Sequence, residues 1–437
     1  MNILKNQLSG TFKMKDLGAA KRVLGIDIHK DRKMSKLWLS HTKYPENVLI
    51  KYELDQAKPA FLAAWKSACS YDGKSHFLVP NGVFLLGPVT FSGSCYKKAS
   101  PNVQIKGIVK ALPNLVAFTD ENWIKFTNLH RFTVSGGGIL DGQGADAWKQ
   151  TTCPEEKKCQ FPPTSTKFTN ITNAVIHDIH LLNSKSFHIS IFRSQGIQLH
   201  NLNITAPGDS PNTDGIHISS STNINITTST IGVGDDCVSI GEGSNDIFVS
   251  GIFCGPGHGI SIGSLGKRPE EKSVIGVHVT NCTLTGTTNG VRIKTWPESP
   301  MLEVSDITFK DIIMDRVSKP IVINQNYCPV QPCTKKPSRV KISHVTYKNI
   351  TGTSSKEYAV ELNCSSAVPC QDMQFTDINL GPMDPTIKAS GLIHSSLQCL
   401  DTISVIRFFL ISLLQILLVN QSLSNLFIKH KSMCCTN

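Results

Sequence analysis

Ionisable residues suited to acid–base chemistry fall in short motifs between residues 212 and 294. From Asp214 to Asp236, on to His258 and on to Arg292, the steps are 22, 22 and 34 residues. Three carboxyl groups, one imidazole and two cations are thereby candidates for proton transfer and for binding an anionic group. The set comprises Asp214, Asp235, Asp236, His258, Arg292 and Lys294.

The apolar residues around these motifs recur as short strands separated by turns. Alternating positions such as Ile197, Leu199, Leu202 and Ile204 return about every 23 to 33 residues, with Asn, Asp, Ser and Gly between strands. A sandwich would need hairpin turns and would show no fixed register. The sequence therefore predicts an all-β protein, a right-handed parallel β-helix. Its coils would lie roughly 4.8 Å apart, so the motifs would meet on one surface.

Each motif also has a simpler explanation. Taken alone, Asp235 and Asp236 after a glycine are typical of a turn, and His258 would be structural. Arg292 and Lys294 alone would be a solvated strand edge. Independent turns have no reason to align ionisable residues in one register, so the shared register favours a functional site.

With these motifs, the chain from Ala60 to about Cys399 resembles plant polygalacturonases of glycoside hydrolase family 28. Supporting stretches are 136–144, 210–217 and 289–297. Around Tyr327 and over 338–342 the sequence is most similar to pollen-type exopolygalacturonases. The resemblance implies an extracellular, pectin-lyase-like β-helix that hydrolyses α-1,4 bonds of polygalacturonate with inversion. It implies a secreted cell-wall monomer with pectin as its partner, no metal or other cofactor, no nucleic acid and no membrane.

The resemblance also assigns roles to the motif residues. Asp235 is the acid that protonates the leaving oxygen, while Asp214 and Asp236 hold and deprotonate the attacking water. His258 would hydrogen-bond the acid and help to keep its protonation state. The expected substrate-binding residues are Asn212, Arg292, Lys294 and Tyr327.

Elementary geometry and electrostatics support several of these roles. Arg292 and Lys294 are two apart on a strand, so both project to the side where they can grip a carboxylate. Crowding three carboxyls raises the cost of ionising all of them, so one stays protonated at mildly acidic pH. Adjacent residues on an ideal strand point to opposite faces, so Asp235 and Asp236 converge only if the backbone bends, which Gly234 permits. Asn212 would order the turn that carries Asp214 rather than touch the sugar.

Cysteine usage predicts an oxidising compartment, because most cysteines fall in close pairs. The expected disulfides join Cys69 with Cys95, Cys153 with Cys159, Cys237 with Cys254, Cys328 with Cys333 and Cys364 with Cys370. Sequons fit a secreted glycoprotein, although the same asparagines also suit the turns of a β-helix. They begin at Asn170, Asn203, Asn225, Asn281, Asn349 and Asn363.

The two ends depart from the family pattern. Residues 1–59 resemble a fragment of a copia-type retrotransposon reverse transcriptase and hold no apolar signal-peptide core. We expect this fragment to lie outside the fold and to have replaced the first strand and the cap of the β-helix, which would leave apolar surface exposed. The chain then divides into this fragment, a catalytic domain over 60–399 and an aberrant apolar tail over 400–437.

The apolar stretch from Ile403 to Val419 is marginal for a membrane span, because it has about 17 residues and contains Arg407 and Gln415. An unremoved intron or a shifted reading frame is the preferred explanation, and a packed terminal helix is the second.

Other functions remain open at this stage. The formal net charge of +11 is compatible with an acidic polymer or nucleic acid, but roughly half of the excess lies before residue 60. A calcium-dependent pectate lyase would share the fold, yet it needs an acidic metal cluster beside an arginine base. A non-catalytic pectin-binding protein and an inactive or misfolded chimera are further alternatives. Similarity to the pollen-type sequences favours exo over endo action.

Overall fold

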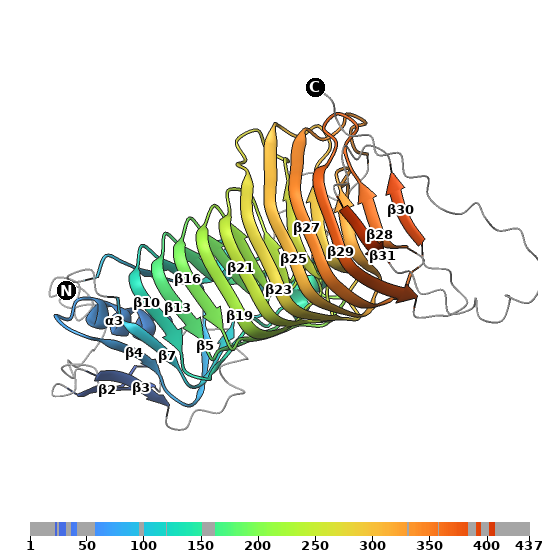
Figure 1. Ribbon diagram of the computed structural model, residues 1–437. Coiled ribbons are helices and arrows are strands. Elements are labelled where there is room, and N and C mark those ends of the chain that lie inside the picture. The colour runs from blue at the N-terminus through green and yellow to red at the C-terminus, as the bar shows by residue number, and fades with distance from the viewer. Residues whose placement is uncertain are drawn as a thin grey trace, which may run out of the picture.

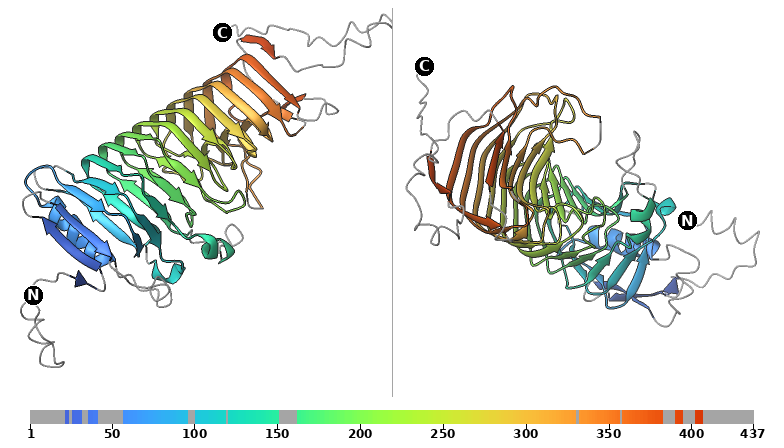
Figure 2. Two further views of the ribbon diagram at one scale, coloured as in Figure 1. Left: turned by 90° about the horizontal axis from the view of Figure 1, so that it is seen from below. Right: turned by 90° about the vertical axis from the view of Figure 1, so that its right-hand side faces the viewer.

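A computed structural model shows two parallel sheets wound around one continuous core (Figure 1). The structure describes residues 57–95, 100–118, 120–150, 162–329, 332–356 and 358–382. Beyond these ranges it describes the backbone of five strands, β1, β2, β3, β30 and β31. Almost every strand pairs in parallel with the strand one coil away, and Figure 2 shows the resulting stack from two further sides. The predicted right-handed parallel β-helix is confirmed.

The sheet that carries the motif residues, here called sheet B, has eleven strands in strict sequence order. They are β6 (Val89–Ser92), β9 (Asn122–Thr127), β12 (Thr164–Thr169), β15 (Ile189–Phe192), β18 (Ile216–Ser219), β20 (Val238–Ile240), β22 (Ile260–Leu265), β24 (Asn289–Thr295), β26 (Lys319–Asn324), β28 (Tyr358–Asn363) and β30 (Ser390–His394).

The remaining strands form sheet A, which wraps the other sides of the coils. They are β1 (Arg22–Val23), β2 (Ile26–Asp31), β3 (Lys36–His41), β4 (His76–Val79), β5 (Val83–Leu86), β7 (Asn102–Ile105), β8 (Ile108–Ala111), β10 (His130–Ser135), β11 (Ile139–Asp141), β13 (Thr172–His177), β14 (His180–Leu182), β16 (Gln195–His200), β17 (Asn203–Thr205), β19 (Thr222–Gly232), β21 (Asn245–Cys254), β23 (Val274–Thr285), β25 (Leu302–Val317), β27 (Val340–Ser354), β29 (Gln371–Pro382) and β31 (Thr402–Ile406). The helical segments are α3 (Lys58–Cys69), η2 (Leu115–Ala117) and α4 (Ala145–Gln150).

Apolar residues of successive coils stack directly on one another in the core. Ile197 pairs with Ile224, and the row continues through Ile247, Val277 and Ile307. All five side chains are at most 1% exposed. Because each coil must present an apolar side chain at the same place, the stacking distance of the coils becomes the repeat that the sequence shows.

A helix covers the N-terminal end of the β-helix (Figure 1). Phe61 and Trp65 of α3 are buried, with ring centroids 5.7 Å from Phe77 and 5.0 Å from Phe91 respectively. Burying each of these aromatic side chains stabilises the fold by roughly 1.5–3 kcal/mol. The expectation of an uncapped, exposed first coil is therefore wrong, because residues just before the first coil supply an amphipathic helix that covers it.

The ends of the solenoid also extend past the predicted boundaries. Helix α3 begins at Lys58, on the other side of the boundary drawn between residues 59 and 60. Strand β3 pairs with β4 through Trp38 and Leu78, and β31 pairs with β29 beyond residue 400. The remaining residues of both terminal segments, including 407–437, lie outside the described residues. The retroelement-like fragment and the aberrant apolar tail therefore stay predictions. Among the described helices, none is long and apolar enough to cross a membrane.

Four of the five expected disulfides are present. They join Cys69 with Cys95, Cys237 with Cys254, Cys328 with Cys333 and Cys364 with Cys370. Cys153 and Cys159 lie outside the described residues. The first of these bridges ties the end of α3 to the loop after β6, so it fixes the cap to sheet B.

Three of the six sequon asparagines adopt a backbone conformation typical of turns. Asn170, Asn281 and Asn349 have positive φ values of 54°, 51° and 51°, in the left-handed region that Asn tolerates better than most residues. The Asn170 amide donates to Asn128 one coil away, at 3.0 Å. The turn role weighed for the sequons is thus present at these three positions, and glycosylation stays a prediction.

Candidate active site

The motif residues lie on four consecutive coils at the middle of sheet B. Asp214 directly precedes β18, Asp235 and Asp236 precede β20, and His258 precedes β22. Arg292 and Lys294 lie within β24. Because β18, β20, β22 and β24 are neighbours in the sheet, residues up to 80 positions apart in sequence form one column. Several of them line a cavity of about 340 Å³: Asn212, Asp214, Asp235, Asp236, Lys294 and Tyr327.

Asp235 and Asp236 converge because the backbone bends between β19 and β20. At Gly234 a Cβ atom would lie 1.9 Å from the carbonyl oxygen of Ser210, so only glycine fits there. The Gly234 amide donates to Thr213 Oγ1 at 2.9 Å, and the Asp236 amide donates to Asp235 Oδ1 at 2.8 Å. The bend expected from the sequence is present. Hydrogen bonds from its main-chain amides to the side chains of Thr213 and Asp235 hold it in place.

Asp236 is the most enclosed carboxylate of the site, with 1% of its side chain exposed. Lys294 Nζ and Arg292 Nη2 each donate to it at 2.8 Å, and Ser261 Oγ donates at 2.7 Å. Burial alone would raise the pKa of Asp236, but Lys294 and Arg292 outweigh burial and lower it to about 2. Asp236 therefore remains a carboxylate throughout mildly acidic pH.

Asp214 has the opposite environment, although it is also buried. Burial raises its pKa well above the ordinary value, and the charges of Asp235 and Asp236 raise it further. Ser239 Oγ donates to Asp214 Oδ2 at 2.6 Å, and His217 Nδ1 lies 2.8 Å from the same hydroxyl. Asp214 thus has a higher proton affinity than an ordinary carboxyl, in the direction that the crowding argument predicted.

His217 and Ser239 were not identified from the sequence. They are Cα partners in adjacent strands, and the row continues through Ser261 to Arg292. A signal was present, because His217, Ser239 and Ser261 each occupy the middle of an apolar-X-Ile triplet. Burial lowers the pKa of His217 to about 4, so its imidazole is neutral above that pH.

Asp235 is the carboxyl that opens most toward solvent. Its side chain is 22% exposed, and its Oδ1 shares a hydrogen bond of 2.8 Å with His258 Nδ1. The main chains are joined as well, because the His258 amide donates to the Asp235 carbonyl at 2.8 Å. His258 therefore orients Asp235 toward the cavity, as the sequence led us to expect.

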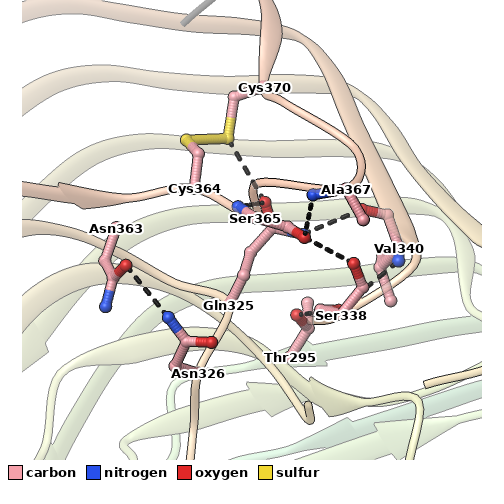
Figure 3. The surroundings of a disulfide bond; sticks show 10 residues. All are labelled: Thr295, Gln325, Asn326, Ser338, Val340, Asn363, Cys364, Ser365, Ala367 and Cys370. Atoms are coloured by element: carbon pink, nitrogen blue, oxygen red, sulfur yellow. Dashed lines mark hydrogen bonds between the residues drawn. A yellow bond between two sulfur atoms is a disulfide. The ribbon is translucent and has the colours of Figure 1, made fainter. Parts of the chain in front are cut away.

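Figure 3 shows a buried network that joins Gln325 to the loop closed by Cys364 and Cys370. Gln325 lies two residues before Tyr327. Cys364 and Cys370 close the loop after β28. Within this loop, the Ser365 amide donates to Gln325 Oε1 at 2.9 Å. Gln325 Nε2 in turn donates to the Val340 carbonyl at 2.8 Å. The Tyr327 amide, two residues on, donates to the Thr295 carbonyl at 3.1 Å. The Gln325 network and this main-chain hydrogen bond anchor the segment that carries Tyr327 beside the end of β24.

The Tyr327 ring completes one wall of the cavity. Lys294 Nζ lies 5.3 Å from its centroid, and the Trp296 ring packs edge-on at 5.5 Å. Asn212 lines the cavity too, but its φ of 54° shows that it also forms the turn before Asp214, as expected. All eight residues proposed from the sequence thus lie at or beside the cavity.

The side chains of Asp235, Asp236 and His258 are close enough to hold a cation, since their candidate ligand atoms lie within 4.8 Å of one another. However, both oxygens of Asp236 accept from the protein cations Arg292 and Lys294. The arginine is thereby engaged in an ion pair rather than free as a base. This arrangement does not resemble the metal cluster with an arginine base that a calcium-dependent lyase needs.

Comparison with known proteins gives consistent matches. Residues 69–399 match the family described as Glycosyl hydrolases family 28. The chain is 44% identical over 348 residues to a polygalacturonase of Gossypium hirsutum, covering 79% of this chain and 83% of that protein. It is 43% identical to an exopolygalacturonase of Platanus acerifolia, covering 74% and 85%. It is 46% identical to an exopolygalacturonase of Arabidopsis thaliana, clone GBGA483, covering 78% and 77%.

Two solved structures share the fold at low sequence identity. A polygalacturonase from Erwinia carotovora superposes with a TM-score of 0.62 at 24% identity, covering 79% of this chain and 95% of that one. An exopolygalacturonase from Thermotoga maritima gives 0.61 at 20% identity, covering 74% and 84%.

Proposed function

This chain belongs to glycosyl hydrolases family 28, and we propose that it hydrolyses the α-1,4-galacturonosidic bonds of polygalacturonate in pectin. The observation that carries the proposal is the split environment of three neighbouring carboxyls. Asp214 has a raised pKa and Asp236 a lowered one, while Asp235 opens to solvent beside His258. Carboxyls with different proton affinities on one groove are what hydrolysis of a glycosidic bond requires.

In the proposed reaction, Asp235 gives its proton to the glycosidic oxygen as the bond from that oxygen to the anomeric carbon breaks. A water molecule attacks the anomeric carbon and passes a proton to Asp214. The raised pKa makes ionised Asp214 a stronger base than an ordinary carboxylate. Asp236 stays anionic, stabilises positive charge that develops on the sugar, and helps to hold the water.

Charge counting supports an anionic sugar as the substrate. Arg292 and Lys294 supply two positive charges against the single carboxylate of Asp236, to which both are bonded. Lys294 lines the cavity, where its ammonium can also pair with a galacturonate carboxylate. A neutral sugar in the same place would not make this ion pair.

A leaving-group experiment separates the acid from the base. Asp235→Asn should abolish hydrolysis of polygalacturonate but retain turnover of an aryl galacturonide whose phenolate leaves without protonation. Asp214→Asn should lose both activities. The matched control is Asp246→Asn, because Asp246 is an exposed turn residue on sheet A. If Asp214→Asn were the variant rescued by the activated substrate, the acid and base assignments would have to be exchanged.

We further propose that this protein is secreted and monomeric and that it cleaves polygalacturonate in the exo mode. Several relatives at 42–46% identity carry the name exopolygalacturonase, and the four disulfides suit an oxidising compartment. Chromatography of the products from polygalacturonate is the test: monomer alone supports exo action, and a ladder of oligomers would establish endo action. Binding of polygalacturonate without cleavage would instead support a non-catalytic pectin-binding protein.

A further inference from the structure

The catalytic cavity continues into a second, larger cavity on the same face of sheet B. This neighbouring cavity has a volume of about 660 Å³ and reaches β12, four strands before β22. Phe187, His217, Gly241 and Ser264 line both cavities, so the two form one continuous groove. The groove therefore extends from the catalytic carboxyls toward the N-terminal coils.

Lys167 lies in this groove on the same row of residues as the catalytic site. It is the Cα partner of Ser190, which pairs with His217, which pairs with Ser239. Ser239 donates to Asp214 at 2.6 Å. Three steps between parallel strands place the backbone of Lys167 roughly 14 Å from that of Ser239. Lys167 thus lies in line with the catalytic site at a distance that a polymer, but not a single sugar, would span.

Among the described residues, the Lys167 ammonium has no ion-pair partner within 4.0 Å, although the carboxylate of Glu121 in the same cavity acts on it from farther away. Its Nζ lies 5.7 Å from the centroid of the Phe192 ring. Burial lowers the pKa of Lys167, Glu121 raises it, and Lys125 lowers it again. Within the part of the chain that the structure describes, this ammonium forms no hydrogen bond or ion pair. A half-buried cation without a hydrogen-bonded counter-ion is costly, and an anionic ligand that contacts it would reduce that cost.

Two acidic side chains of the same cavity that are not fully exposed, Glu242 and Glu271, are already engaged by hydrogen bonds. Glu242 accepts from Ser220 Oγ at 2.8 Å and from the Lys272 amide at 3.1 Å. Glu271 accepts from two backbone amides, at 2.6 and 3.1 Å, and is 9% exposed. These carboxylates hold the loops of the groove, so Lys167 is the half-buried charge in it that remains available for a ligand.

We propose that Lys167 binds the carboxylate of a galacturonosyl unit that lies several units away from the bond being cleaved. This inference rests on the proposed function. It makes the groove a binding track for the polymer on the N-terminal side of the catalytic carboxyls, and it makes Lys167 a positioning residue for long substrates. A short oligomer that occupies only the catalytic cavity does not reach it.

The test is the dependence of kcat/KM on substrate length for the parent and for Lys167→Met. Oligogalacturonates of increasing length should show a rise in kcat/KM for the parent at the length that first reaches Lys167. Lys167→Met should lose that rise, by about ten-fold on polygalacturonate, because a hydrogen bond to a charged group contributes on this order. The shortest cleaved oligomer should be hydrolysed equally well by both proteins, and the loss should appear in KM.

The matched control is Lys348→Met, because Lys348 is an exposed lysine on β27 of sheet A, away from the groove. It should leave the length dependence unchanged. If Lys167→Met and the parent had the same length dependence, the inference would be wrong, and the polymer would leave the catalytic cavity toward the C-terminal coils. An equal loss on short and long substrates would show a structural role and would also overturn it. Failure of the parent to cleave any oligomer would instead refute the proposed function.

Discussion

The buried ion pair between Lys294 and Asp236 should contribute far more to stability than an exposed pair of the same length. Lys294 Nζ lies 2.8 Å from Asp236 Oδ2, with the two side chains 8% and 1% exposed. Lys319 Nζ also lies 2.8 Å from its partner, Glu361 Oε2, but these side chains are 47% and 21% exposed. The two pairs have the same N–O distance and differ in burial. Changing each lysine to methionine therefore compares the loss of a buried pair with the loss of an exposed one.

For Lys294→Met we expect the free energy of unfolding to fall by about 3 kcal/mol at pH 7. Removing one partner of a buried pair costs roughly 3–5 kcal/mol, because the remaining charge is left uncompensated. The lower end applies here, since Arg292 still donates to Asp236 at 2.8 Å. For Lys319→Met the expected loss is about 0–1 kcal/mol, because water screens the pair.

The pH dependence supplies an independent check. The pKa of Asp236 is about 2 against an ordinary value of 3.8, which corresponds to about 2 kcal/mol of stability. Because the folded-state pKa is lowered, this stability is present above pH 4 and is lost as the pH falls toward 2. The parent should therefore lose more stability than Lys294→Met over that window, and the difference between them should shrink.

Urea denaturation of the parent and both variants at pH 7, 4 and 2.5 measures these quantities. The reasoning would be refuted if Lys294→Met cost no more than Lys319→Met at pH 7. A difference between parent and variant that stayed constant from pH 4 to 2.5 would refute the assignment of the lowered pKa to Asp236.

Three further predictions follow from the same geometry. Asp214→Asn should be more stable than the parent at neutral pH but not at pH 3, in urea denaturation, because the raised pKa means that ionising Asp214 costs stability as the pH rises; an equal or lower stability at neutral pH would contradict this. Gly234→Ala should lose activity and thermal stability, because its Cβ would lie 1.9 Å from the Ser210 carbonyl, whereas Gly381→Ala, with open space around it, should change the free energy of unfolding by no more than about 0.5 kcal/mol. Proton NMR of freshly cleaved oligogalacturonate should show the β-anomer first if hydrolysis inverts. Initial release of the α-anomer would instead point to a covalent intermediate and would refute inversion.

The sequence by itself determined the solenoid and the column of motif residues. A coil stacked on its neighbours must repeat its apolar residues, so Ile197, Ile224 and Ile247 record the register directly. The close cysteine pairs and the bend at Gly234 could be predicted for a similar reason, because they depend on neighbours in the chain. The covering role of residues 58–69 was missed, and the domain boundary was drawn two residues inside this helix, because a short amphipathic helix carries little sign of the core it covers. Phe61 and Trp65 find their partners only after β4 and β6 are in place.

Only the tertiary structure decided how the three carboxyls differ. In the sequence Asp214, Asp235 and Asp236 are equivalent aspartates, and composition cannot rank their proton affinities. Stacking of the coils brings Arg292 and Lys294 from 56 and 58 residues away onto Asp236, and leaves buried Asp214 with the hydroxyl of Ser239. Because a pKa depends on burial and on distances to other charges, the chemistry of this site is fixed by the folding of β18 to β24 and not by the residue types alone.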